Sequence, residues 1–94
     1  MPDVYILECA DGSYYVGLAQ YDLEARVSEH NLGTYPDAWT YKRRPVLLVF
    51  NENYDRFDDA VAREQQIKGW SRAKKEALIA YNYDGLPELA KRRT

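Results

Sequence analysis

Residues 10–17, ADGSYYVG, decide the local fold of this chain. The pair Asp11 and Gly12 is a turn signal, and it connects two segments with the composition of strands, DVYILECA (3–10) and SYYVGLA (13–19). We therefore predict an antiparallel hairpin. Its second strand places two tyrosines next to a glycine, although a purely structural strand is expected to carry bulk at every inward position. The pattern indicates that something comes close to the sheet there.

The length of the hairpin loop decides which tyrosine shares a face of the sheet with Tyr5. A two-residue loop puts Tyr5 on one face with Tyr14. A three-residue loop, 10–12, instead makes Tyr5 a diagonal neighbour of Tyr15 and places Gly17 opposite Tyr5. We favour the three-residue loop because only its glycine then needs a positive φ angle. Gly17 then leaves the Tyr5 ring uncovered, either as a gap through which a ligand approaches the hydroxyl or as an ordinary bulge glycine.

The remaining pattern predicts one more strand and several helices. Asp22 and Ser71 are suitable helix caps, and Gly33 is a suitable helix stop. In the first strand, apolar residues occupy both of the alternating sets of positions, which face opposite sides of the sheet. We therefore expect this strand to be buried on both sides. The continuous apolar run at 45–52 predicts a strand that is central or covered on both faces. The other predicted elements are helices at 22–33, 57–69, 72–81 and 85–93 and a loop at 34–45.

Length and composition predict a single domain, 1–94. No apolar run approaches the roughly 20 residues of a membrane span, so we expect no membrane association. The first residues show no basic region ahead of an apolar one, and we expect no signal peptide. Cys9 is the only cysteine, which excludes an internal disulfide and favours a reducing, cytoplasmic location. We expect a monomer or a weak homodimer.

Charge is distributed unevenly along the chain. The net charge is −2, yet residues 1–41 hold seven acidic side chains and one basic one, whereas residues 42–94 hold twelve basic and eight acidic ones. The basic residues cluster at 41–45, 71–76 and 90–93. These clusters would attract a polyanion. Alternatively they are solvated faces, and the acidic net charge then favours a small protein-interaction domain.

Three features are out of place in a purely structural domain. Glu64 is a carboxylate on the apolar stripe of the helix at 57–69, where burying it unpaired would be costly. Arg26 and His30 are four residues apart and therefore lie on one helix face. Tyr5 and Tyr15 share a face of the sheet under the favoured register.

Each feature also has an ordinary explanation. Glu64 can pair with Arg26 or Arg63, His30 can bond a helix C-terminus, and the tyrosines can be core rings with a wet hydroxyl. Taken together, a carboxylate, an arginine, a histidine and two phenols can hold a divalent metal, neutralise a phosphate and move a proton. This set suits phosphodiester hydrolysis better than acyl transfer, since no Ser/Cys-His-Asp arrangement is evident.

Four segments of the chain resemble the GIY-YIG endonuclease domain, and specifically the small stand-alone bacterial proteins called predicted endonucleases with a URI domain. The resemblance covers residues 3–80 and leaves 81–94 as a C-terminal helical extension. It departs from the family at VYI, which keeps the phenol of GIY and loses the preceding glycine. The segments that carry it are VYI (4–6), YVG (15–17), DLEARVSEHN (22–31) and REQQIKGWSRAKKEALI (63–79).

The resemblance implies an α+β fold with a central three-stranded antiparallel sheet flanked by helices. It implies hydrolysis of nucleic acid with one Mg²⁺ or Mn²⁺, with Glu64 as the metal ligand. Tyr5 or Tyr15 would take the proton of the attacking water, His30 would relay it or orient the phenol, and Arg26 would clamp the scissile phosphate. The residues that it makes catalytic are Tyr5, Tyr15, Arg26, His30 and Glu64.

The rest of the chain is expected to bind substrate. We expect DNA, in repair or recombination, and structure-selective cleavage rather than a sequence code. Trp39, Tyr41 and Trp70 can stack on unpaired bases, although for Trp70 we favour packing against the sheet. Larger relatives gain their target from an added domain, so the alternative is a nucleic-acid-binding module with weak or no catalysis. The predicted substrate-binding residues are Gly17, Asn31, Lys42, Arg43, Arg44, Arg72, Lys74 and Lys75.

Overall fold

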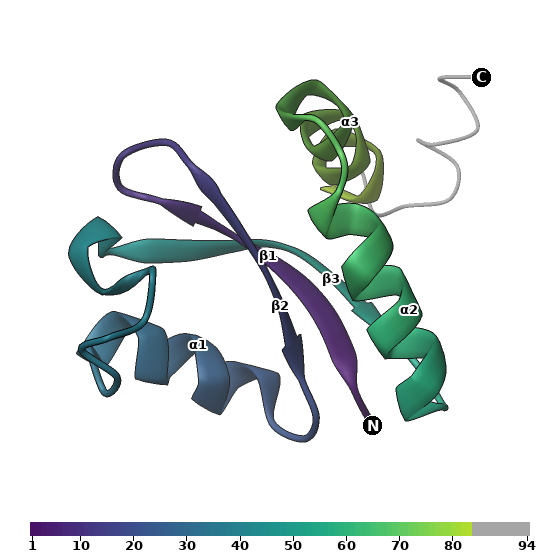
Figure 1. Cartoon of the computed structure of the whole chain (residues 1–94), viewed down its shortest axis with the longest axis horizontal. Helices are drawn as coiled ribbons and strands as arrows, with labels where there is room; N and C mark the ends of the chain where they lie inside the picture. Colours follow the sequence, from purple (N-terminus) through teal and green to yellow (C-terminus); the bar gives the residue numbers. More distant parts are fainter. Residues whose placement is uncertain (84–94) are drawn as a thin grey trace.

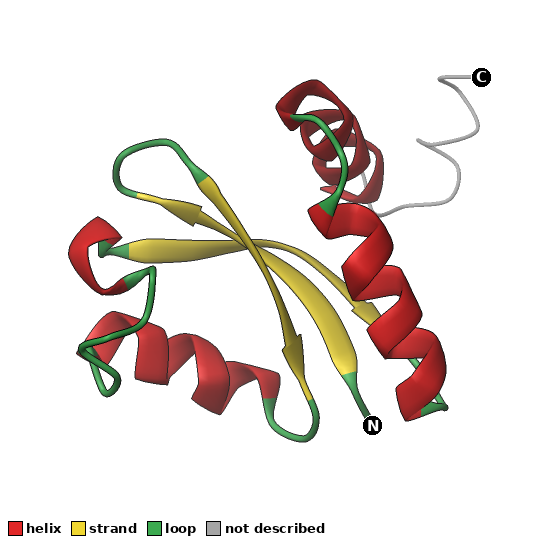
Figure 2. Ribbon diagram, in the orientation of Figure 1, coloured by secondary structure: helices red, strands yellow, loops and turns green. Residues whose placement is uncertain are grey.

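A three-stranded antiparallel sheet lies between helices on its two faces, which makes the fold α+β (Figures 1 and 2). The computed structural model describes residues 1–83. The predicted helix at 85–93 lies outside the described residues. In chain order the elements are β1 (Asp3–Cys9), β2 (Tyr14–Ala19), α1 (Leu23–Leu32), a 3-10 helix η1 (Tyr41–Arg43), β3 (Val46–Asn53), α2 (Phe57–Lys68) and α3 (Arg72–Tyr83).

Strand β1 is the central strand, in the order β2-β1-β3, and it is buried on both sides as predicted. Its successive side chains point to opposite faces of the sheet and belong to two separate apolar clusters. Val4 and Ile6 pack with Ala60 and Ile67 of α2 on one face. On the opposite face the side chain of Tyr5 joins the cluster that α1 covers. The fully buried core on the first face is therefore apolar, whereas the core on the second face contains the buried phenol of Tyr5.

The prediction that the third strand is central or covered on both faces is wrong. β3 is an edge strand, and Leu47 within it is 64% exposed. An apolar run shows that a strand packs somewhere but not where it stands in the sheet. Because β2 pairs with one edge of β1 through the hairpin, β3 takes the other edge, and within residues 1–83 its own outer edge has no partner strand.

The hairpin has the three-residue loop that was favoured. Tyr5 pairs with Gly17 and Leu7 pairs with Tyr15. The loop closes through a hydrogen bond from the Gly12 amide to the Cys9 carbonyl at 2.9 Å, and Gly12 has a φ angle of 86°. A positive φ is required at this glycine alone within the loop, which explains the choice of register.

The helix boundaries agree closely with the capping residues. The Asp22 side chain accepts a hydrogen bond from the amide of Ala25, and Gly33 ends α1 with a φ angle of 72°. The Ser71 hydroxyl caps α3 by accepting a hydrogen bond from the Lys74 amide at 3.2 Å. Among the described residues, no helix has the length and apolar character needed to cross a membrane.

Candidate active site

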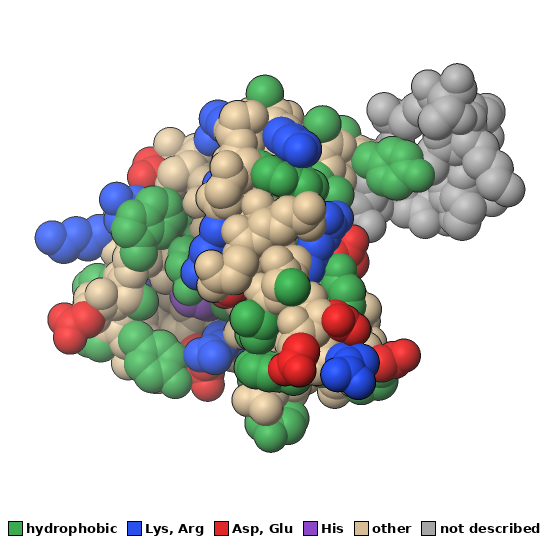
Figure 3. Space-filling model, turned by 45° about the vertical axis from the view of Figure 1, so that its right-hand side comes forward, with side chains coloured by type: hydrophobic (Ala, Val, Ile, Leu, Met, Phe, Trp, Pro, Cys, Tyr) green, Lys and Arg blue, Asp and Glu red, His purple; other side chains and the backbone are tan. Residues whose placement is uncertain are grey.

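Three of the predicted catalytic residues meet between the sheet and α1. The Tyr5 hydroxyl lies 3.1 Å from Nε2 of His30, within hydrogen-bond distance. The Tyr15 ring lies with its centroid 6.3 Å from that of Tyr5 and 5.2 Å from that of His30. The register of the hairpin brings the tyrosines together, and the last turn of α1 brings the histidine. The only histidine of the chain (purple in Figure 3) lies at the bottom of a surface hollow, with basic side chains on its rim.

Gly17 makes room for Tyr5 rather than for a ligand. A Cβ atom at this position would lie 2.5 Å from the Tyr5 hydroxyl oxygen and 2.9 Å from Cε2 of Tyr15. The predicted gap over an uncovered ring is therefore wrong, since Tyr5 itself fills the space and is only 1% exposed. The glycine of the second strand instead allows the phenol to lie flat over the sheet and reach α1.

Thr40 is a member of the site that the sequence analysis missed. Its hydroxyl oxygen lies 2.7 Å from Nδ1 of His30, and its side chain is buried. It comes from the segment 34–45, which was predicted only as a loop because of its polar composition. Nothing in the spacing of that segment pointed to the histidine, since the contact depends on how the loop docks against α1.

The surroundings shift the pKa values of both hydrogen-bonded groups. Burial, more than any nearby charge, raises the pKa of Tyr5 well above its ordinary value. Of the charges that act on this phenol, Arg26 lowers its pKa and Glu64 raises it. Burial and then the positive charge of Arg26 lower the pKa of His30. At neutral pH the pair is therefore a protonated phenol and a neutral imidazole.

Arg26 lies one helical turn before His30, and its side chain is 41% exposed. Its Nη1 is 3.8 Å from a carboxylate oxygen of Glu29 on the same helix, a weak surface pair. A cavity of about 390 Å³ runs along α1, with Arg26, Glu29 and Tyr35 among the residues that line it. Of the five predicted catalytic residues, only Arg26 lines this cavity. The guanidinium is therefore open to a ligand from solvent.

Glu64 is mostly buried, with 13% of its side chain exposed. Neither of the arginines predicted as ordinary partners pairs with it. Arg63 instead bonds Glu52 of β3 at 2.9 Å. The cation that pairs with Glu64 within residues 1–83 is Lys68, one turn later on α2, at 3.3 Å. Since the Lys68 side chain is 49% exposed, its ammonium can turn to solvent and leave the Glu64 carboxylate to a metal ion.

The donor set around the site fits one kind of metal. No group of three or more His, Cys, Asp or Glu side chains suited to a metal occurs in the part of the chain that the structure describes. Such a group is what a closed zinc or calcium site needs. A single carboxylate suits Mg²⁺ or Mn²⁺, since magnesium keeps several waters and takes few protein ligands. Glu64 would hold the metal.

The predicted basic residues before β3 hold their own loop in place. The Arg44 guanidinium lies over the Tyr41 ring, with Cζ 4.2 Å from its centroid, and donates to the Tyr41 carbonyl at 2.8 Å and the Asn31 carbonyl at 3.4 Å. Arg43 lies over the Trp39 ring, with Cζ 3.8 Å from its centroid. These contacts give both arginines a structural role. Trp39 itself is 45% exposed and stacks on Tyr15, with the ring centroids 6.1 Å apart.

Asn31 has a structural role in this structure, and its contact with substrate stays a prediction. Its side-chain Nδ2 donates to the Val46 carbonyl at 3.0 Å, and its Oδ1 accepts from the Val46 amide at 2.7 Å. Both polar atoms are thus engaged with the first residue of β3. Asn31 thus joins α1 to the start of β3. Because Asn31 follows His30 directly, these bonds help to fix the position of His30 relative to Tyr5 on the sheet.

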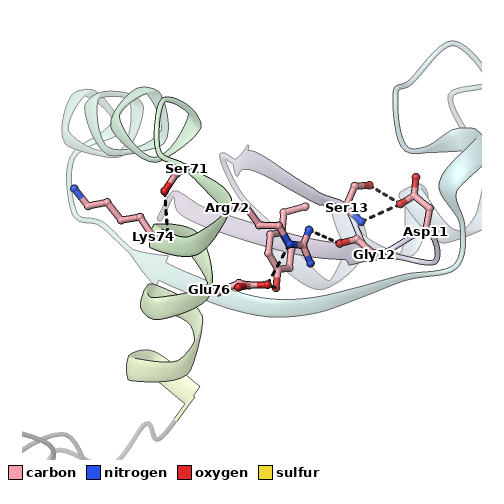
Figure 4. Close-up of polar contacts among 8 residues, drawn as sticks. Asp11, Gly12, Ser13, Ser71, Arg72, Lys74 and Glu76 are labelled. Atoms are coloured by element: carbon pink, nitrogen blue, oxygen red, sulfur yellow. Dashed lines mark hydrogen bonds and ion pairs between the residues drawn. The ribbon is translucent and has the colours of Figure 1, made fainter.

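The second basic cluster lies at the other side of the hairpin turn. Figure 4 shows Arg72 of α3 donating to the Gly12 carbonyl, at 2.6 Å, and pairing with Glu76, at 3.1 Å. Lys74 lies over Trp70, with Nζ 4.3 Å from the ring centroid, and Trp70 packs against the apolar face of the sheet. The second of the two alternatives for Trp70 is therefore confirmed.

Lys42 and Lys75 are the two predicted substrate-binding residues that keep their charge available. Within residues 1–83, neither side chain takes part in a hydrogen bond or an ion pair. Lys42 is exposed on η1 and Lys75 is half-buried on α3. Their contact with nucleic acid stays a prediction.

Comparison with known proteins extends over most of the chain. The GIY-YIG catalytic domain family matches residues 1–77, which include all five predicted catalytic positions. A UPF0213 protein of Halobacterium salinarum is 46% identical over 79 residues, 84% of this chain and 100% of that protein. A UPF0213 protein of Staphylococcus aureus is 47% identical over 76 residues, 81% of this chain and 90% of that protein. The solution NMR structure of a UPF0213 protein from Bacillus halodurans is 37% identical, with a TM-score of 0.55 over 85% of this chain and 84% of that one.

Proposed function

Because the chain belongs to the family of the GIY-YIG catalytic domain, we propose that it is a metal-dependent endonuclease that hydrolyses phosphodiester bonds in nucleic acid. The observation that carries the proposal is the hydrogen bond of 3.1 Å between the Tyr5 hydroxyl and Nε2 of His30. It joins a proton donor and a proton acceptor, and the charges of Arg26 and Glu64 act on the same phenol. Such a set supplies proton transfer, phosphate binding and a metal ligand.

The proton of the attacking water passes to the Tyr5–His30 pair. Because burial raises the pKa of Tyr5, the phenolate does not form by itself at neutral pH. The Tyr5 oxygen therefore accepts the proton of water as its own proton moves to Nε2 of His30, which becomes an imidazolium. The water oxygen forms a bond to phosphorus, the bond to the leaving oxygen breaks, and the leaving oxygen takes a proton from solvent. The pair avoids a buried phenolate at every stage.

Arg26 binds the scissile phosphate. Its guanidinium is 41% exposed beside the cavity along α1, and its weak pair with Glu29 is easily exchanged for a phosphate. Two parallel N–H donors match two phosphate oxygens, and this interaction strengthens as negative charge accumulates on them. Tyr15, packed against His30 and Trp39, holds the histidine ring in place and is itself half-buried.

Glu64 would hold the metal ion through its carboxylate. Mg²⁺ or Mn²⁺ would supply Lewis acidity, which lowers the pKa of water and offsets the charge that develops on the phosphate. The Lys68 ammonium, now paired with the carboxylate, would be displaced toward solvent. We propose DNA, in repair or recombination, as the substrate, with Lys42 and Lys75 contacting its backbone.

The decisive experiment is a cleavage assay on end-labelled DNA and RNA in single-stranded, duplex, flap and branched forms. Wild type and Glu64→Gln are compared in Mg²⁺, in Mn²⁺ and in EDTA. We expect wild type to cut at least one substrate only when a metal is present, and Glu64→Gln to lose roughly 100-fold or more of that rate. The matched control is Asp58→Asn, which removes an exposed carboxylate from the same helix and is expected to cut normally.

The outcomes separate the proposal from its rival. Cleavage by Glu64→Gln at the wild-type rate, or cleavage in EDTA, would contradict the assigned metal ligand. Absence of cleavage on every substrate, with binding retained by both proteins, would instead identify a nucleic-acid-binding module. Binding is measured in the same reactions by electrophoretic mobility at several salt concentrations, because contacts to phosphates weaken as salt increases.

A further inference from the structure

Both ring nitrogens of His30 face a buried hydroxyl group. Nε2 lies 3.1 Å from the phenol of Tyr5, and Nδ1 lies 2.7 Å from the hydroxyl of Thr40. Tyr5 and Thr40 are each 1% exposed, so water does not compete freely for either contact. The three residues form an unbroken row from the loop, across α1, to the central strand.

A neutral imidazole has one N–H group and one lone pair, and the partners of the ring decide which nitrogen carries the proton. A hydroxyl can donate or accept, so two arrangements satisfy the ring. In one, Tyr5 donates to Nε2 and Thr40 accepts from Nδ1–H. In the other, Thr40 donates to Nδ1 and Tyr5 accepts from Nε2–H.

The chemistry of the two hydroxyls favours the first arrangement. A phenol is a much stronger acid than an alkyl alcohol, and its oxygen lone pair is delocalised into the ring. Tyr5 is therefore the better hydrogen-bond donor of the two, and Thr40 is the better acceptor. Only this arrangement also directs the lone pair of Nε2 at the proton of Tyr5.

We propose that Thr40 is a positioning residue that holds His30 as the Nδ1–H tautomer, so that Nε2 can take the proton of Tyr5. The catalytic consequence rests on the proposed nuclease function, whereas the tautomer itself does not. As the proton moves from the Tyr5 oxygen to Nε2, the ring gains a second N–H and Thr40 keeps accepting from Nδ1–H. Without this acceptor, the ring favours Nε2–H, which donates to Tyr5 and leaves the phenol proton with no base.

The fold holds Thr40 at this position from both sides. The Thr40 carbonyl accepts a hydrogen bond from the Arg43 amide at 2.9 Å, which starts η1. Arg44 fixes the other end of η1 to α1 through the carbonyls of Tyr41 and Asn31. The loop that carries the threonine is thus attached to the helix that carries the histidine. The half-buried Arg44 side chain is thus one of the groups that hold this loop on the helix.

The test is a nitrogen NMR spectrum of the full chain labelled with ¹⁵N-histidine, recorded without substrate above the pKa of the ring. Because the chain has one histidine, the two imidazole nitrogens are assigned without ambiguity. Their chemical shifts distinguish a protonated nitrogen from one that carries a lone pair. We expect wild type and Thr40→Ser to show Nδ1–H, and Thr40→Val, which has nearly the same shape but no hydroxyl, to shift toward Nε2–H.

Cleavage rates are measured on the same proteins. Thr40→Val is expected to lose on the order of 100-fold in kcat with little change in KM, and Thr40→Ser to keep most of the activity. Thr40→Ala serves as the second hydroxyl-free variant if Thr40→Val does not fold. An Nε2–H tautomer in wild type overturns the proposal, as does an unchanged tautomer in a folded variant without the hydroxyl. Since the spectrum needs no substrate, failure of the nuclease proposal is distinguishable from failure of this one.

Discussion

The hydroxyl group of Tyr5 on the central strand and Nε2 of His30 on α1 are 3.1 Å apart, although 25 positions separate the residues in the chain. The contact is buried, and it spans the space between the sheet and the helix that covers it. The Tyr5 side chain does more than fill the core. A leucine at position 5 would also fill the core, and it would bury no hydroxyl group that needs a hydrogen-bond partner.

We predict that Tyr5→Phe abolishes most of the cleavage activity, with a loss of roughly 100-fold or more, because it removes the group that exchanges protons with His30. The measurement is single-turnover cleavage with excess protein. The matched control is Tyr14→Phe. Tyr14 lies on β2 and packs on the opposite face of the sheet, where its hydroxyl meets Glu76 at 3.5 Å, and activity is expected to be unchanged. Equal losses in the two variants would show that the assay reports stability and not chemistry.

Gly17→Ala is expected to reduce the free energy of unfolding by about 1–3 kcal/mol, because the new Cβ would overlap the Tyr5 ring and hydroxyl. It should also displace the hydroxyl from His30 and lower the cleavage rate. Denaturant unfolding measures the first effect. Gly69→Ala is the control, since its φ angle is −82° and no atom lies closer than 3.6 Å to the added Cβ. A variant at position 17 as stable as the one at position 69 would refute the close contact.

The stability of the protein should depend on pH through His30. Burial and Arg26 lower its pKa in the folded state, whereas the unfolded chain titrates near the ordinary value of about 6.5. Between these two pKa values the unfolded state binds more protons, so the free energy of unfolding decreases as pH falls through this window. Urea unfolding at a series of pH values tests this against His30→Gln. Because the chain has one histidine, the variant should lose this part of the pH dependence, and equal slopes would exclude the mechanism.

Two basic residues that were predicted together should behave differently. Lys42→Ala is expected to weaken binding of nucleic acid and to reduce the salt dependence by about one counterion, with no change in stability. Arg72→Ala should mainly lower stability, because its guanidinium joins α3 to the hairpin turn through the Gly12 carbonyl. Binding isotherms at several salt concentrations and thermal unfolding of both variants separate the two roles. A loss of stability in Lys42→Ala would contradict the assignment.

Much of the candidate site could be predicted because its residues lie in locally determined elements. The loop of three residues follows from the need for a positive φ at Gly12, and it selects Tyr15 instead of Tyr14 as the partner of Tyr5. The caps of α1 fix its phase, and the spacing of four then puts Arg26 and His30 on one face. The contacts that the polar side chains make within the protein could not be predicted in this way. The position of Arg44 in the sequence, for example, does not reveal that the Asn31 carbonyl of α1 is near.

The sequence by itself determined the hairpin register and the helix boundaries, because these depend on backbone preferences and on short spacings, and its resemblance to a family singled out the Tyr, Arg, His and Glu set as the candidate site. Only the tertiary structure decided that β3 is an edge strand, that Gly17 makes room for Tyr5, and that Thr40 reaches His30. Those features depend on how segments far apart in the chain pack together. Packing is settled by the joint burial of many side chains, and no single stretch of residues contains it.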